Sequence, residues 1–253
     1  MDHAARVYDN VLEMLPSEEN PSPLVRINAL NPAPASGLAL YAKLEWMNPF
    51  GSVKDRAAWE MIRDLEERGK LGPGGGSGKA RTIVEPTSGN TGLSLALIAA
   101  VRGHGMRAVV PSKVPTEKKV LLKIAGAELD VVSDEMCPSP AHSASGGGEG
   151  SINMARTYAR VEPDRYAMPN QYENPANARA HERTTGPEIW RQTQGRVTHV
   201  FTSLGTCGTV TGLSRYLRTK NPGVKVYAVQ PSPGHDVPGL RNTSELDVSK
   251  LFD

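Results

Sequence analysis

The sequence lacks the features that mark secreted, membrane or nucleic-acid-binding proteins. It contains two cysteines among 253 residues, too few for a disulfide framework. Its longest apolar run, around residues 93–101, is too short to cross a bilayer. The formal net charge is +2, and acidic and basic residues are interspersed, so we expect no polycationic surface. These absences predict a protein that binds neither a membrane nor nucleic acid.

Other absences concern compartment and chemistry. The first six residues lack the apolar core of a signal peptide, so we expect a cytoplasmic protein. The six histidines are scattered along the chain, and no metal-binding cluster is expected. Hydrophobic residues make up 38% of a chain that is long enough for one large domain or two small ones. Composition therefore predicts a globular protein without specifying its activity.

Strands and helices alternate along the chain, which predicts an α/β protein with parallel sheets and helices on both sheet faces. Ligands in such folds bind at the carboxyl ends of strands. Two glycine-rich stretches are expected to be a surface connection (residues 72–78) and either a mobile loop near the site or a surface insertion (residues 138–150). Strands are expected at residues 38–44, 80–84, 107–110, 128–132, 197–201 and 224–230, and helices at residues 54–67, 91–101, 116–125, 150–159, 178–194 and 213–218.

The most informative motif is NPFGSVKDR at residues 48–56, which places Lys54 after a turn and at the start of a helix. The positive end of the helix dipole disfavours a cation there and would lower the pKa of the amine. A lysine with a lowered pKa is a nucleophile that can condense with an aldehyde. From this motif alone, a solvated lysine that happens to begin a helix is the simpler interpretation.

Two further motifs each join an expected strand to an expected helix. Residues 85–92 read EPTSGNTG, a small-residue turn whose N–H groups and hydroxyls would suit an anion, although an ordinary turn has the same composition. Residues 203–212 read SLGTCGTVTG, where glycines allow close backbone approach to a ligand and threonines add donors. The second turn lacks the Gly-Lys-Ser/Thr ending of a P-loop and the Rossmann spacing, so neither nucleotide motif is indicated.

Together these motifs resemble the cysteine synthase and cystathionine β-synthase family, pyridoxal-phosphate (PLP) enzymes of the tryptophan-synthase-β-like fold. The resemblance runs from about residue 23 to residue 253 and includes residues 115–119, 126–129, 170–177 and 184–190. It implies a smaller α/β domain at residues 45–168, which carries the asparagine loop (residues 85–92). Residues 1–44 and 169–253 would form a larger domain that binds the cofactor phosphate. Family members usually continue further, so we expect the larger domain to be incomplete at its C-terminus.

The resemblance also implies a reaction. Lys54 would hold PLP as an imine, remove the α-proton of an amino acid and later return it. Loss of a β-substituent would give an α-aminoacrylate, to which sulfide or another thiol adds. Thr-Gly after the asparagine is typical of this β-replacement branch rather than of the dehydratases. The implied product is L-cysteine, made from O-acetylserine or O-phosphoserine. The alternatives are cystathionine β-synthase, another β-replacement or β-elimination on serine or its esters, or a non-catalytic truncated relative.

Roles of single residues follow from the resemblance by position. Asn90 would bind the ring oxygen of the cofactor. Arg241 lies in a segment similar to one that binds phosphate in phosphoserine-using cysteine synthases, although an ordinary surface arginine is equally consistent. Cys207 stands where the family often has glycine, and we expect it to be buried and without a catalytic role. A homodimer is also expected. The implied cofactor-binding residues are Lys54, Asn90, Gly205, Thr206, Cys207, Gly208 and Thr209, and the implied substrate-carboxylate residues are Thr87, Ser88, Asn90, Thr91 and Gln171.

Overall fold

The computed structural model describes residues 7–72, 81–87, 89–133, 150–235, 237–244 and 251. Ser88 and most of both glycine-rich stretches, residues 73–78 and 138–149, lie outside this description. The strands are β1 (Leu24–Arg26), β2 (Tyr41–Lys43), β3 (Thr82–Pro86), β4 (Met106–Pro111), β5 (Glu128–Val132), β6 (Tyr166–Ala167), β7 (His199–Ser203) and β8 (Lys225–Val229). The α-helices are α1 (Lys54–Glu67), α2 (Asn90–Arg102), α3 (Thr116–Ile124), α5 (Ser151–Val161), α6 (Ala176–Ala180), α7 (Gly186–Gln192) and α8 (Gly208–Lys220). Short turns of other helix types are η2 (Val11–Met14), η3 (Pro34–Ser36), η4 (Glu45–Met47) and η6 (His181–Thr185).

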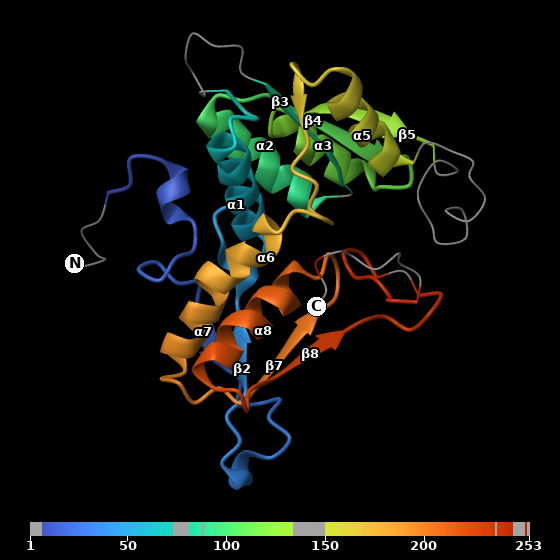
Figure 1. Ribbon diagram of the computed structural model, residues 1–253. Coiled ribbons are helices and arrows are strands. Elements are labelled where there is room, and N and C mark those ends of the chain that lie inside the picture. Colours follow the sequence, from blue (N-terminus) through green and yellow to red (C-terminus); the bar gives the residue numbers. More distant parts are fainter. Residues whose placement is uncertain are drawn as a thin grey trace.

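A four-stranded parallel sheet forms the centre of one half of the molecule, the upper half in Figure 1, with the strand order β5-β4-β3-β6. Neighbouring residues of β3 point to opposite faces, as the two-residue period of a strand requires. Ile83 packs in the cluster formed with α1, α2 and α3, whereas Val84 packs with Ala155 of α5. The predicted parallel sheet with helices on both faces is therefore confirmed for this half.

The second half contains a two-stranded parallel sheet, β7-β8, packed against α8. Leu213 and Leu217 of α8 form a buried cluster with Val224, which precedes β8. On the strands themselves, Phe201 is 67% exposed and Tyr227 43% exposed, and their rings stack with centroids 5.0 Å apart. Within the described residues, helices thus cover one face of this sheet and not both.

Helix α1 lies beside α2 in the upper half of Figure 1 and also packs against α6, and its sequence explains both contacts. Apolar residues recur at helical spacing on two adjoining stripes. Ala58 and Ile62 belong to the cluster of the four-stranded sheet, whereas Ala57 and Met61 pack against Ala176 of α6. The helix that begins at Lys54 is therefore held by both halves. The boundaries proposed for two domains, at residues 44/45 and 168/169, stay a prediction.

Two elements differ from the sequence-based expectation. Only residues 41–43 of the strand predicted at 38–44 are extended, and β2 pairs antiparallel with β1 instead of joining a parallel sheet. Strand β1 was not predicted, and neither was the two-residue β6. Strand β1 has three residues and β6 has two, which is too short for the alternation of apolar and polar residues that identifies a strand in a sequence.

The helix predicted at residues 178–194 is also interrupted. It is divided into α6, a π-helical turn at η6, and α7. Close packing against α8 accompanies the interruption: a Cβ added at Gly212 would lie 2.3 Å from the carbonyl oxygen of Ala178, and one added at Gly186 would lie 2.8 Å from the ring of Tyr216. Pro187, which has no N–H to donate, is the second residue after the π turn. Hydrophobic periodicity does not report such an insertion, so the sequence could not reveal it.

Candidate active site

The three sequence motifs meet at one open cleft. Two of them follow strands of the parallel sheets directly, after β3 and β7, as expected. The Lys54 motif does not, because η4 and a turn separate it from β2, which lies in the antiparallel pair. Of the residues implied by the resemblance, the cleft is lined by Lys54, Thr87, Asn90, Thr91, Gln171, Gly205, Thr206 and Arg241, and not by Cys207, Gly208 or Thr209.

Lys54 is the first residue of α1, and its side chain is half-buried in the cleft. Burial lowers the pKa of its amine. The direction is the predicted one, and desolvation by the surrounding residues is its cause. No carboxylate of the described residues forms an ion pair that would restore the charge. The site therefore holds an amine that loses its proton, and becomes nucleophilic, more readily than a surface lysine.

Asp55 joins the helix of Lys54 to the helix of Asn90. Its buried carboxylate accepts the N–H of Phe50 at 2.8 Å and the hydroxyl of Ser94 at 2.6 Å. Ser94 lies one turn after Asn90 in α2. The starts of α1 and α2, which carry Lys54 and Asn90 into the cleft, are thus connected by one buried side chain.

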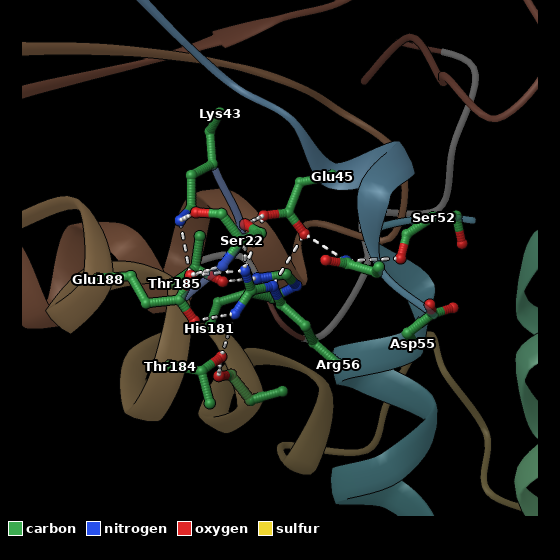
Figure 2. Close-up of polar contacts among 12 residues, drawn as sticks. Ser22, Lys43, Glu45, Ser52, Asp55, Arg56, His181, Thr184, Thr185 and Glu188 are labelled. Carbon is green, nitrogen blue, oxygen red and sulfur yellow. Dashed lines mark hydrogen bonds and ion pairs between the residues drawn. The ribbon is translucent and has the colours of Figure 1, made fainter. Parts of the chain in front are cut away.

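Arg56, two residues after Lys54, lies at the centre of the buried polar network drawn in Figure 2. Its guanidinium contacts Glu45 through Nε and Nη2 at 2.8 Å each, and Glu188 of α7 through Nη1 and Nη2 at 2.5 and 2.9 Å. Lys43 adds a second cation, with Nζ 2.6 Å from Glu188. Burial opposes ionisation of Glu45, but the hydrogen bonds from Arg56 lower its pKa to about 2. The network fixes the start of α1 against the second half of the molecule.

Glu85, at the end of β3, positions the loop that carries Gln171. Its fully buried carboxylate accepts the backbone N–H groups of Asn170 at 2.8 Å and of Gln171 at 2.9 Å. Burial raises the pKa of Glu85 to about 7. The hydroxyl of Thr91 donates to Oε1 of Gln171 at 2.7 Å, so the hydroxyl proton of Thr91 is already engaged. A substrate carboxylate would therefore use the backbone N–H of Thr91, which lies in the first turn of α2.

Thr87 holds the asparagine loop in shape through hydrogen bonds to its backbone. Its Oγ1 accepts the N–H groups of Gly89 at 3.2 Å and of Gly92 at 3.0 Å. A Cβ at Gly92 would lie 2.4 Å from Cγ2 of Thr87, which explains the glycine at that position. The turn that begins α2 is thus stabilised by Thr87 before any ligand is considered.

The glycine-rich turn before α8 combines a ligand-facing part with a packing part. Gly205 and Thr206 line the cleft, and Thr206 Oγ1 accepts from the Asn177 amide at 2.8 Å. Gly208 has a packing role, because a Cβ there would lie 2.1 Å from Asn177 Oδ1. Cys207 is buried, as expected, although its φ of 67° is unusual for a residue with a side chain. The turn leads into α8, whose N-terminal N–H groups suit an anion.

Thr209 lies behind this turn and contacts a buried histidine. Its hydroxyl is 3.2 Å from Nε2 of His181, whose Nδ1 is 2.9 Å from Thr185 Oγ1. Burial lowers the pKa of His181 to about 3, so the ring is neutral at physiological pH. His181 thus joins the π turn to the start of α8 by hydrogen bonding and not by charge.

Sequence reasoning missed part of the cleft lining. Lys118 is the most consequential omission: residues 115–119 were recognised as similar to the family, but nothing in that stretch pointed to a ligand. Among the described residues, the charged side chains of the lining are Lys54, Lys118 and Arg241, and none is acidic. Because these charges are all positive, the cleft is suited to anionic groups. The described residues also contain no cluster of three side chains suited to a metal ion. The other unpredicted lining residues are Gly89, Tyr172, Pro238 and Gly239.

We find no helix in the described part of the chain whose length and hydropathy would suit a membrane span.

Comparison with known proteins agrees with this geometry. The chain is 42% identical over 220 residues to cysteine synthase B of Salmonella typhimurium, covering 87% of this chain and 66% of that relative. It is 36% identical over 224 residues to a cystathionine beta-synthase of Apis mellifera, covering 88% of this chain and 42% of the relative. The crystal structure of O-acetyl serine sulfhydrylase isoform 3 from Entamoeba histolytica superposes with a TM-score of 0.81 at 31% identity, covering 98% of this chain and 71% of that chain.

The chain thus spans about two thirds of the Salmonella relative's length. A family model described as "Pyridoxal-phosphate dependent enzyme" matches residues 15–250, a range that includes every motif of the cleft. With the lysine, the asparagine loop and the glycine-rich turn on one cleft, the chain belongs to the family of pyridoxal-phosphate dependent enzymes.

Proposed function

We propose that this protein makes L-cysteine by a PLP-dependent β-replacement, in which sulfide takes the place of the β-substituent of an activated serine. The observation that carries the proposal is the amine of Lys54, with its pKa lowered by burial, in the same cationic cleft as the asparagine loop and the glycine-rich turn. The names of the Salmonella and Entamoeba relatives support this reaction.

The residues of the cleft fit the cofactor. Lys54 offers an amine that can condense with the aldehyde, and no described carboxylate competes for it. The N–H groups around Gly205 and Thr206, before the start of α8, would hold the phosphate, and the exposed Asn90 would reach the ring oxygen. When bound, PLP supplies an electron-poor ring system that stabilises negative charge at the α-carbon of an amino acid.

The chain's own groups would then perform the remaining steps. Thr87, Ser88, Asn90, Thr91 and Gln171 would bind the substrate carboxylate, Thr91 through its backbone N–H and Gln171 through Nε2, because the Thr91 hydroxyl already donates to Oε1 of Gln171. Lys54, once released from the aldehyde, would take the α-proton and later return it, because burial lowers the pKa of its amine and makes the neutral, basic form more accessible than in a surface lysine. Asp55 and the Arg56 network would hold α1 so that Lys54 keeps its place during both transfers.

A direct test is the formation of cysteine from sulfide and O-acetylserine by the PLP-loaded protein. We expect activity that Lys54→Ala abolishes. Lys123→Ala, which removes an exposed lysine of α3, should retain it and serves as the control. A cofactor-loaded protein that forms no cysteine from either O-acetylserine or O-phosphoserine would refute the proposal.

Arg241 bears on which serine ester is the donor. Its backbone N–H donates to the carbonyl of Leu204 at 2.7 Å, which places the residue beside the glycine-rich turn, and Arg241 is one of the residues that line the cleft. A guanidinium there would pair with a phosphate ester, so we propose that O-phosphoserine competes with O-acetylserine. Arg241→Ala should then slow turnover of the phosphate ester much more than turnover of the acetyl ester. A similar loss on both esters, or no loss on either, would remove this assignment.

Similarity to the Apis mellifera enzyme supports a second candidate, in which a larger thiol replaces sulfide. Assays with serine and homocysteine would separate the two, because only a cystathionine synthase forms the thioether at a comparable rate. The homodimer and the cytoplasmic location stay predictions.

A further inference from the structure

We propose that Lys118 binds the carboxylate of the amino-acid substrate. This assignment rests on the proposed function, because it requires an amino acid in the cleft. It adds a charged residue from a different helix to the uncharged loop residues that the family resemblance indicates for the same group.

The position of Lys118 supports this role. It lies in the first turn of α3, and its side chain reaches the cleft. Its Cδ and Nζ atoms are 3.3 and 3.5 Å from the point that a Cβ of Gly89 would occupy. The side chain therefore lies directly over the asparagine loop, and the absence of a side chain at Gly89 leaves room for it.

The electrostatic surroundings of Lys118 point the same way. Within the described residues, its ammonium group forms no ion pair, and no acidic side chain lines the cleft. Lys119, the next residue, donates from Nζ to the Ser112 carbonyl at 2.6 Å and does not line the cleft. Lys118 is half-buried beside the start of α2, and among the described residues its ammonium group lacks an anion, which a substrate carboxylate would supply.

The carboxylate is a better match than the β-substituent of the donor. Lys118 lies over Gly89, next to Asn90, whereas Arg241 lies beside Leu204 and the glycine-rich turn. The two cations therefore approach different parts of the cleft. Lys118 would contact a group that every donor shares, whereas Arg241 would distinguish one ester from another.

The test compares two ligands of the PLP-loaded protein, L-serine and L-serinamide, which differ only in the carboxylate. Binding is followed by the change in the visible absorbance of the cofactor. We expect Lys118→Gln to lower the affinity for L-serine by about tenfold, which is the effect of one charge-assisted hydrogen bond. The affinity for L-serinamide should stay almost unchanged. Lys118→Arg should restore most of the serine affinity. Lys123→Gln makes the same charge change at an exposed position of α3, and it should leave the affinity for both ligands unchanged.

The outcomes separate this assignment from the proposed function. Unchanged serine binding by Lys118→Gln, or an equal loss for serine and serinamide, would overturn the role of Lys118 while leaving the enzyme's function intact. A wild-type protein that holds PLP but forms no cysteine from either ester would overturn the proposed function and with it the role of Lys118.

Discussion

At the scale of single residues, burial shifts the pKa of ionisable groups in and behind the cleft. Desolvation lowers the pKa of Lys54 and of His181, and it raises the pKa of Glu85. The motif around Lys54 predicted the lysine and the direction of its shift from sequence. Its cause was not predictable, because desolvation depends on which segments pack around the amine, and those segments are distant in the sequence.

Glu85 gives a prediction about pH. Its pKa is about 7 in the folded protein, against an ordinary 4.5. The folded state therefore binds more protons than the unfolded state between these values, so the stability that this group contributes is full below about pH 4.5 and is lost as the pH rises through about 7. Urea unfolding of wild type and Glu85→Gln should show the wild type losing on the order of 1–3 kcal/mol relative to the variant between about pH 5 and pH 8.

Glu85→Gln is the appropriate comparison because glutamine stays neutral and keeps one acceptor oxygen for the N–H groups of Asn170 and Gln171. A wild-type stability that rises relative to the variant over this range would show that the two N–H donors outweigh desolvation.

At the scale of elements, buried polar contacts and close helix packing fix the cleft residues in place. The network in Figure 2 connects the segment before α1 to α7, and Asp55 connects α1 to α2. The sequence placed α1 at the observed residues because its apolar positions have helical spacing. It could not show that Arg56 and Glu188, 132 residues apart, would meet.

Removing Arg56 should be strongly destabilising. Arg56→Met leaves the buried carboxylate of Glu188 and the half-buried carboxylate of Glu45 without their shared cation, and we expect a loss of about 3–5 kcal/mol in the free energy of unfolding. Arg63→Met on the same helix removes an arginine whose side chain is 42% exposed, and it should cost less than about 1 kcal/mol. Equal effects of the two substitutions in denaturant unfolding would contradict a structural role for the network.

Close contact between α8 and α6 gives a third prediction. Gly212→Ala places a methyl group 2.3 Å from the carbonyl oxygen of Ala178, a backbone atom that cannot rotate away. Since the helices must separate, we expect destabilisation on the order of 3 kcal/mol, seen as a lower midpoint of thermal unfolding. Ser214→Ala, two residues later in the same helix and half-buried, is the matched control. If Gly212→Ala were as stable as Ser214→Ala, the two helices would not be closely packed.

At the scale of the whole molecule, the cleft gathers segments that are far apart in the sequence. The asparagine loop and the glycine-rich turn were predictable, because each follows a strand of a parallel sheet, where ligand sites form. Lys118 was not, because a lysine in the first turn of an amphipathic helix gives no signal that distinguishes it from a solvated one. The antiparallel pair β1-β2 and the π turn were missed because their signals are too short or aperiodic.

The central claim is that Lys54 forms the covalent link to PLP, and mapping that link tests it most directly. The protein is supplied with one equivalent of PLP, reduced with borohydride, digested and analysed by mass spectrometry. We predict a pyridoxyl group on the peptide that contains Lys54, its disappearance in Lys54→Ala, and no comparable label on Lys118 or Lys123. Label distributed over other lysines with Lys54 unmodified would contradict the account.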